Sequence, residues 1–328
     1  MSLTPRVAIT AVLVCGLGVF LFPSEVVHAD SVDCGDVITA DTVLDSDLTC
    51  AAEGLVIGAS GVTLDLNGHT LTGPGLTCNP CVFPPGASVP SGVRVQGRDG
   101  VTIKNGYITG FVYGIRLVNA SNNIIDHVVT TASTFNGISL FNDSDSNLVS
   151  HCTSSNNASF GVIINGGSDG NMVRHCTLAQ NGTGVFIGGG GTGAPSFGNH
   201  VEHTQAHNNV FAGIHIRNAD SNVLQHNVVS TNDFGIVISE GADANLAGQN
   251  IVNHNGRSGL LLPAQSTGLP QPENNLLIRN RLHGNGTSGA PGGTDIRDAT
   301  TGEESLGTRN HYNGNQCGTS FPGGLCGR

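Results

Sequence analysis

The feature that most constrains this chain is an internal repeat with a period in the low twenties. A Gly that precedes alternating aliphatic residues recurs at positions 114, 137, 161, 184, 213, 235 and 259. An Asn followed by aliphatic residues recurs in phase with it, at positions 123, 147, 171, 199, 222, 245 and 275. Each period contains short alternating segments separated by Asn, Gly, Asp and Ser, with no helical periodicity. A unit this short cannot close a core alone, so successive units must stack.

Stacked units of this kind predict an all-β fold, a single-stranded right-handed parallel β-helix of about nine to ten coils. Equal positions then form columns about 4.8 Å apart, and Asn suits such columns because its amide both donates and accepts hydrogen bonds. We expect one domain, with an N-terminal cap over residues 30–54, coils over 55–293, and a last partial coil and C-terminal cap over 294–328. Caps protect the unpaired strand edges at the two ends.

Residues 1–29 have the composition of a secretory signal peptide. Arg6 precedes an apolar run, Pro23 ends it, and small residues lead to a cleavage site near Ala29. We therefore expect a secreted or periplasmic monomer, and no later segment is apolar over a length that spans a membrane. The 24 acidic and 13 basic residues give a net charge of −11, which repels a phosphate backbone and excludes nucleic acid as a partner.

Removing the signal peptide leaves eight cysteines, an even number in an exported chain, which predicts disulfides. Two local pairs are expected to clamp the ends of the solenoid, and a third to staple a loop. These pairs are Cys34 with Cys50, Cys317 with Cys326, and Cys78 with Cys81. Cys152 and Cys176 lie 24 residues apart in one inward column, where the spacing allows either a disulfide or a buried thiol pair.

Two segments carry a resemblance to a known group of proteins. "GVTLDLNGHTLTG" (61–73) and "GVTIKNGYITGF" (100–111), followed by the Asn-based repeats to about residue 285, resemble the right-handed parallel β-helix repeat proteins. That group belongs to the pectate-lyase-like superfamily. It includes carbohydrate-binding and sugar-cleaving proteins and periplasmic accessory proteins of copper-enzyme maturation. The resemblance implies the fold, whereas function depends on individual sites.

A His column accompanies the Asn repeat, four positions after the Asn in five consecutive coils. Its members are His127, His151, His175, His203 and His226. The next column along the chain contains small and stackable residues that suit the interior, so the His side chains are expected to point outward. Imidazoles repeated on a rigid face could bind Cu or Zn, which predicts metal handling as one function. The alternative is that His replaces Asn as an exposed polar residue.

A carboxylate column precedes the Asn by two positions, at Asp145, Asp169, Asp220 and Asp243. Carboxylates on adjacent coils could hold Ca²⁺, while capping of the corner explains the same residues without a metal. No cofactor is required by the pattern, so Ca, Cu and Zn are open alternatives.

Two long inserts, at 188–198 and 264–274, leave the same corner and are expected to flank a groove about 14 Å wide. Outward side chains on that strand column are the candidate ligand-binding residues for a hydroxyl-rich polymer. They are Arg94, Arg116, His215, Arg217 and Glu240. Phe135, Phe160, Phe211 and Phe234 precede the repeated Gly and are interpreted as a core stack.

The catalytic motifs of β-helix hydrolases and epimerases are absent from the sequence, so catalytic residues stay unknown. The first hypothesis is an exported protein that binds a carbohydrate or another extended polymer along one face. The alternatives are metal handling by the His column, a polysaccharide lyase or glycoside hydrolase, and a purely structural surface protein.

Overall fold

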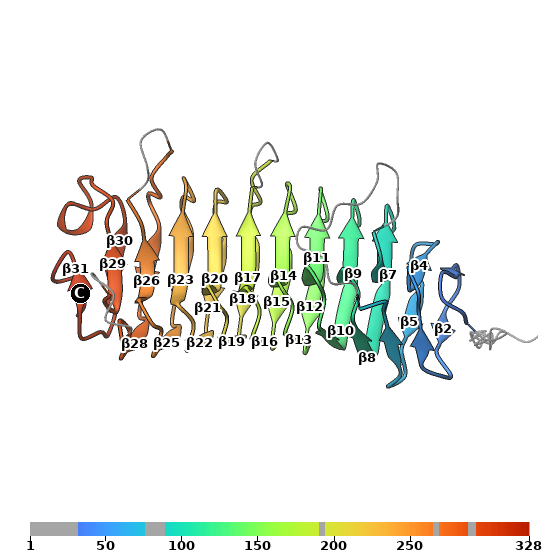
Figure 1. Ribbon diagram of the computed structural model, residues 1–328. Helices are drawn as coiled ribbons and strands as arrows, with labels where there is room; N and C mark the ends of the chain where they lie inside the picture. Colours follow the sequence, from blue (N-terminus) through green and yellow to red (C-terminus); the bar gives the residue numbers. More distant parts are fainter. Residues whose placement is uncertain (1–31, 76–88, 190–193, 265–268, 288–292, 328) are drawn as a thin grey trace, which may run out of the picture.

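The computed structural model describes residues 32–75, 89–189, 194–264, 269–287 and 293–327. The chain winds as a parallel β-helix of about eleven turns, with its N-terminal coils at one end and the C terminus at the other (Figure 1). The predicted fold is confirmed, and the predicted number of coils is slightly low. The predicted signal peptide with its cleavage site, and the predicted Cys78–Cys81 pair, lie outside the described residues. Among the described residues no helix is long and apolar enough to cross a membrane.

One wall of the β-helix is a 12-stranded parallel sheet, the row of arrows nearest the viewer in Figure 1. Its strands, in spatial and chain order, are β1 (Val37–Ile38), β4 (Leu55–Ile57), β7 (Ser91–Gln96), β9 (Tyr113–Val118), β11 (Asn136–Phe141), β14 (Phe160–Asn165), β17 (Thr183–Gly188), β20 (Ala212–Arg217), β23 (Phe234–Ser239), β26 (Ser258–Leu262), β29 (Ile296–Asp298) and β31 (Ser320–Phe321).

Two further rows of strands form the remaining walls, and the long strands β8 (Thr102–Thr109) and β10 (Ile124–Thr131) belong to both rows. One row contains β2 (Thr42–Val43), β5 (Thr63–Asp65), β12 (Leu148–Ser150), β15 (Met172–Arg174), β18 (His200–Glu202), β21 (Val223–Gln225), β24 (Leu246–Gly248), β27 (Leu276–Ile278) and β30 (His311–Asn313). The other contains β3 (Leu48–Thr49), β6 (Thr70–Thr72), β13 (Thr153–Ser155), β16 (Thr177–Ala179), β19 (Gln205–His207), β22 (Val228–Ser230), β25 (Ile251–Asn253) and β28 (Arg281–His283). A short 3-10 helix, η1 (Ser305–Gly307), lies near the C terminus.

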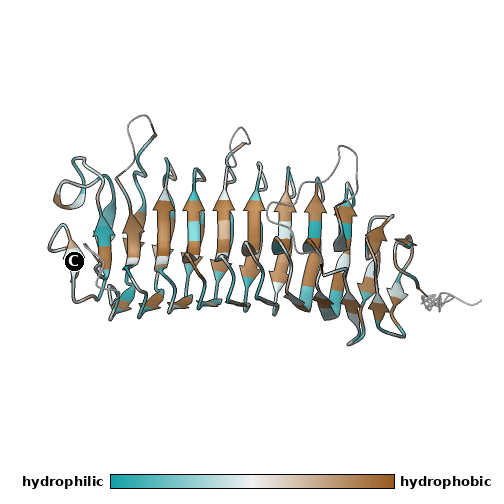
Figure 2. Ribbon diagram, viewed as in Figure 1, coloured by the Kyte–Doolittle hydropathy of each residue, from teal (hydrophilic) through white to brown (hydrophobic). Residues whose placement is uncertain are grey.

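Alternation along each strand places one aliphatic column after another in the interior. In β9, Ile115 and Leu117 are fully buried, and their register partners in β11, Ile138 and Leu140, are buried directly beside them. The apolar residues continue from strand to strand along the 12-stranded sheet (Figure 2). Because each coil repeats the same alternation, the core is a continuous rod instead of a central cluster.

Asparagine ladders satisfy the polar groups of the corners. In the first ladder, each buried Asn donates its backbone N–H and its side-chain Nδ2 to the Oδ1 of the Asn one coil later. At Asn222 these two hydrogen bonds to Asn245 measure 2.8 and 3.0 Å. A second ladder runs from Asn157 to Asn285, and a third, not foreseen as a ladder, runs from Asn227 to Asn315. The predicted stacking of the Asn columns is therefore confirmed.

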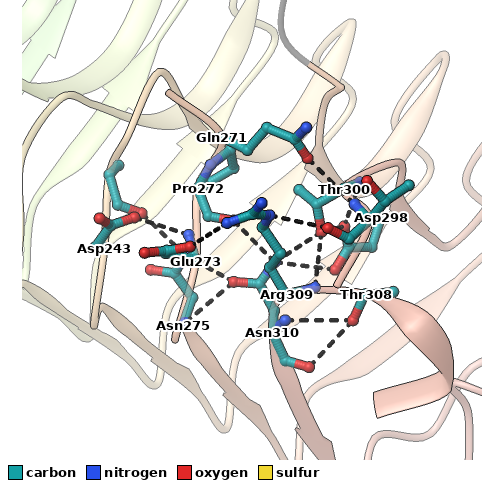
Figure 3. Close-up of polar contacts among 12 residues, drawn as sticks. Asp243, Gln271, Pro272, Glu273, Asn275, Asp298, Thr300, Thr308, Arg309 and Asn310 are labelled. Carbon is teal, nitrogen blue, oxygen red and sulfur yellow. Dashed lines mark hydrogen bonds and ion pairs between the residues drawn. The ribbon is translucent and has the colours of Figure 1, made fainter. Parts of the chain in front are cut away.

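Two of the three ladders end at carboxylates near the C terminus, whereas the third ends at Asn315, whose Nδ2 donates to the carbonyl of Leu277. Asn275 donates Nδ2 to Oδ1 of Asn310 at 2.9 Å, and Asn310 in turn donates to the buried Asp298 at 3.1 Å (Figure 3). The second ladder ends when Asn285 donates to Asp295 at 2.9 Å. An aspartate suits this position because the last member of the ladder only has to accept hydrogen bonds.

Close approach of the coils explains the repeated Gly. A Cβ atom built on Gly235 would lie 2.3 Å from the carbonyl oxygen of Gly259 in the next coil, which no real side chain tolerates. At the His column the constraint is on the backbone conformation instead of on space: His127 and its equivalents have φ of 49 to 56°, in the left-handed region. Left-handed backbone favours Asn, Asp and His among non-glycine residues.

Disulfides clamp the two ends as predicted. Cys34 pairs with Cys50 and Cys317 with Cys326. Cys152 and Cys176 are buried free thiols. The hydrogen bond with Cys176, together with burial, raises the pKa of the Cys152 thiol, so it stays protonated at neutral pH.

Candidate functional site

The five column histidines lie outward at one corner and stack ring on ring. Centroid separations along the column are 4.7, 5.3, 5.1 and 5.0 Å, with interplanar angles of 19, 5, 26 and 19°. The neighbouring inward column is buried, and it includes Val128, Cys152 and Asn227. The outward direction predicted from that column is therefore correct.

Asp126 connects the first two histidines of the column. Its Oδ2 lies 2.7 Å from Nδ1 of His127, and its Oδ1 lies 2.9 Å from Nδ1 of His151 in the next coil. The hydroxyl of Ser150 also donates to Oδ1, at 2.7 Å. Burial opposes ionisation of Asp126, but the hydrogen bonds from Ser150 and the two histidines outweigh it and lower its pKa to about 2. The carboxylate is thus charged at neutral pH.

The carboxylate column bonds to the backbone of the following coil. Asp145 accepts the N–H of Asp169 at 2.8 Å, and Asp220 accepts that of Asp243 at 2.8 Å. Within the described chain, the only group of three or more metal-ligating side chains whose ligand atoms lie within 4.8 Å of one another is Asp126 with His127 and His151. The Asp column thus provides caps between coils and does not gather three ligands.

The predicted polymer-binding residues lie on the outer face of the 12-stranded sheet. Register places Arg94 beside Arg116, and the column continues through Ser139, Ile163 and Phe186 to His215. Arg94 pairs with Glu53 at 3.1 Å, whereas Arg116 lies over the ring of Tyr113, 5.3 Å from its centroid. The two arginines are therefore separated from His215 by several coils, and the candidate residues form two clusters on one face.

The second cluster surrounds His215. Its Nε2 lies 2.9 Å from the hydroxyl of Ser239, and its ring contacts the rings of Phe186 and Phe211 at 5.3 and 5.5 Å. Burial, with a smaller effect from the charge of Arg217, lowers the pKa of His215 to about 4. The imidazole is therefore neutral at pH 7, and its protonation is disfavoured.

Arg217 and Glu240 form an ion pair beside this imidazole, with Nε and Oε2 2.6 Å apart. The two inserts predicted to flank a groove include residues 190–193 and 265–268, which lie outside the described residues. On the coils between the inserts, His215 lies in register with the buried Val237, and Arg217 pairs with Glu240.

The interpretation of four phenylalanines as a core stack is wrong. Phe135 and Phe211 are each 40% exposed, and Phe160 and Phe234 are partly exposed on the outer face of the sheet. The second Asn ladder fills the interior at this corner: a Cβ on Gly161, which follows Phe160, would lie 2.9 Å from the amide of a ladder Asn. The rings therefore turn outward.

These rings form what we call the aromatic track, together with the other rings that they contact. Its members are Tyr113, Phe135, Phe141, Phe160, Phe186, Phe211 and Phe234. Contacting centroids lie 4.9 to 6.0 Å apart, in three sets: Tyr113 with Phe135 and Phe141, Phe160 with Phe186, and Phe211 with Phe234. The ring of His215 contacts both Phe186 and Phe211 and so connects the last two sets. Sequence reasoning missed this track because it assigned four of its members, Phe135, Phe160, Phe211 and Phe234, to the interior.

A pocket of about 330 Å³ lies at the C-terminal end of the track. Phe234, Leu261 and Pro263 provide apolar walls, and Arg257 and Arg297 provide charge. The guanidinium of Arg257 lies 5.3 Å from the centroid of the Phe234 ring, and its Nε lies 3.3 Å from Oδ1 of Asp233. Sequence analysis did not single out these two arginines, although Arg297 lies in register with Leu261 on the outward column.

Comparisons with known proteins agree on the fold. The family described as "right handed beta helix region" matches residues 56–201, and no curated protein matches the chain significantly in sequence. The A-module of the Azotobacter vinelandii mannuronan C-5 epimerase AlgE6 is similar, with a TM-score of 0.60, 15% identity, and coverage of 84% of both chains. The periplasmic alginate epimerase AlgG gives a TM-score of 0.59 at 12% identity, over 85% of this chain and 70% of that one.

A third solved structure is the catalytic domain of a GH87 α-1,3-glucanase in complex with nigerose. Its TM-score is 0.50 at 14% identity, and the match covers 78% of this chain and 59% of that one. Identities this low establish architecture and leave activity open. Together with the coil geometry, the comparisons identify the fold of this chain as a right-handed parallel β-helix.

Proposed function

We propose that this protein binds an extended carbohydrate polymer along the outer face of the 12-stranded sheet. The observation that carries the proposal is the aromatic track: all of its rings except the buried Phe186 are at least partly exposed on that face. A sugar ring offers an apolar face and hydroxyl edges, so flat rings next to hydrogen-bond donors suit it. Arg116 and Arg257 each lie over a ring of the track and provide such donors.

The length of the face favours a polymer over a single sugar. The outward column from Arg94 to Arg297 covers eight coil steps, which at about 4.8 Å per step is about 38 Å. Support also comes from the solved structures of similar fold, which include alginate epimerases and a glucanase bound to nigerose.

An extracytoplasmic location fits this proposal. The disulfides Cys34–Cys50 and Cys317–Cys326 are bonds that persist in oxidising compartments. A polymer outside the cytoplasm would be accessible to a chain exported by the predicted signal peptide.

Affinity electrophoresis of the purified chain in gels containing alginate, polygalacturonate, α-glucan or β-glucan tests the proposal. We expect retardation by at least one polymer, and Phe211→Ala should weaken it about fivefold or more, because a central aromatic contact contributes at least about 1 kcal/mol. Tyr107→Ala is the matched control, since Tyr107 is 49% exposed on β8, away from the 12-stranded sheet. Absence of retardation by every polymer, or equal effects of the two variants, refutes the proposal and favours a structural role.

The neutral imidazole of His215 provides a direct test of a lyase activity at the same face. A base is needed for β-elimination, and the imidazole of His215 is unprotonated at pH 7, but its pKa of about 4 makes it a weak base, so retardation without product is the expected result. Incubation with uronate polymers and Ca²⁺ is followed by near-ultraviolet absorbance of unsaturated product. Product that disappears in His215→Gln extends the function to a lyase, whereas retardation without product identifies a binding protein.

A further inference from the structure

The corner that contains the His column requires a residue with left-handed backbone conformation, but that residue need not be histidine. Asn105, Gln249 and Arg279 occupy equivalent corners with φ of 51 to 57°. Asn, Asp and His all suit this conformation, so backbone geometry alone does not select histidine over Asn or Asp in five consecutive coils.

The N-terminal end of the column differs from the rest because a carboxylate joins it. Asp126 contacts Nδ1 of both His127 and His151, which belong to two successive coils. In register with Asp126, later coils have Ser150 and then Arg174. A carboxylate therefore accompanies the first two rings, whereas the cationic Arg174 directly precedes the third histidine and disfavours a cation there.

The charges around Asp126 leave the cluster suited to a cation. Lys104, one coil before Asp126, lies 3.4 Å from Asp65, so its positive charge is offset by a carboxylate of its own. The side chains of His127 and His151 are 59% and 45% exposed, which gives an ion and its remaining water ligands direct access.

We propose that Asp126, His127 and His151 bind one divalent transition-metal ion of the Cu²⁺ and Zn²⁺ class. The three residues offer ligand atoms that lie within 4.8 Å of one another, and two imidazoles with one carboxylate form a donor set that both ions favour. Ca²⁺ and Mg²⁺ prefer oxygen ligands, so two imidazoles select against them. Three protein ligands at an exposed corner leave a coordination position open, as in sites that exchange or activate a ligand instead of stabilising a fold.

This metal site lies at a corner next to β10 and β12, away from the outer face of the 12-stranded sheet. It is therefore independent of the proposed carbohydrate function, and either proposal can fail alone.

Isothermal titration of the untagged, chelator-treated chain with Cu²⁺ and with Zn²⁺ tests the site. We expect one ion per chain, and His151→Asn and Asp126→Asn should each weaken binding at least about tenfold. Asn is chosen for His151 because Asn105 already occupies the equivalent left-handed corner, and an unchanged far-ultraviolet circular dichroism spectrum verifies the fold. His226→Asn is the matched control, at the other end of the same stack, and should bind as the wild type does.

Electron paramagnetic resonance of the Cu²⁺ complex gives a second readout. Nitrogen coupling from imidazole is expected in the wild type and should be reduced in His151→Asn. Absence of stoichiometric uptake of either ion overturns the proposal. So does an equal loss of affinity in His226→Asn and His151→Asn, which indicates unspecific binding by surface histidines. Displacement of the bound ion by Ca²⁺ at equal concentration also overturns it.

Discussion

Replacing Asn222 by Asp removes the hydrogen-bond donors from the middle of the first asparagine ladder while keeping the shape of the side chain. Asn222 is fully buried, and its Nδ2 donates to Oδ1 of Asn245 at 3.0 Å and to the carbonyl of Ser196 at 3.4 Å. Its Oδ1 accepts two hydrogen bonds from Asn199. In Asn222→Asp the accepting side is preserved, but an ionised oxygen faces two buried acceptors.

These contacts set the expected loss in the free energy of unfolding of Asn222→Asp. A buried group left without its partner costs roughly 1 to 3 kcal/mol, so two such groups cost about 2 to 6 kcal/mol at neutral pH. A protonated carboxyl regains one donor, so the pKa of the new group is higher in the folded than in the unfolded state. Such a group stabilises the fold below its unfolded pKa, of about 3.9, and loses that contribution as pH rises through the folded pKa. The difference in the free energy of unfolding between the wild type and Asn222→Asp should therefore become smaller as the pH is lowered.

Guanidinium unfolding at pH 7 and at pH 4.5 measures the global effect. Amide hydrogen exchange in the coils around Asn222 measures the local effect, because a repeat array can open one interface at a time. Asn253→Asp is the control, since Asn253 is half-buried on β25 and outside the ladders, and it should cost less than about 0.5 kcal/mol. A loss below about 1 kcal/mol in Asn222→Asp, or a loss equal to that of the control, would refute the argument that the ladder stabilises the coils.

Three further predictions concern the caps, the close contacts and the outer face. Cys34→Ser opens the bridge to Cys50, 16 residues away, and should lower the free energy of unfolding by about 3 kcal/mol; an unchanged denaturation midpoint contradicts this. Gly235→Ala should lower the free energy of unfolding by about 1 to 3 kcal/mol, because the added Cβ overlaps a carbonyl oxygen of the next coil. Gly323→Ala is its control in the same assay: a Cβ there has nothing within 4 Å, so the loss should be below about 0.5 kcal/mol. Because the pKa of His215 is about 4 when folded and 6.5 in the reference state, the unfolded chain binds the extra proton, and stability should fall by roughly 2 to 3 kcal/mol as pH drops from 6.5 to 4. His215→Gln should flatten that part of the stability profile, and an unaltered profile contradicts the assignment.

The candidate sites were predictable to different degrees. The outward direction of the His column followed from the small and polar residues of the next column, which suit the interior. The link between Asp126 and His151 did not follow, because the register column of Asp126 changes from Lys104 through Asp126 to Ser150 and Arg174, so periodicity does not reveal its role. The Phe residues were misplaced because their spacing to the repeated Gly is compatible with either side of the wall, and the Asn ladder occupies the inner side.

The sequence by itself determined the stacking of coils, the inward columns and the end disulfides, because each coil repeats the previous one and every repeat adds evidence for the same geometry. Only the tertiary structure decided which features break that repetition. The track of outward rings, the carboxylate between His127 and His151, and the aspartates that end two of the ladders each depend on contacts between side chains from different coils. Periodicity describes what neighbouring coils share, whereas these sites arise from what one coil has and its neighbours lack.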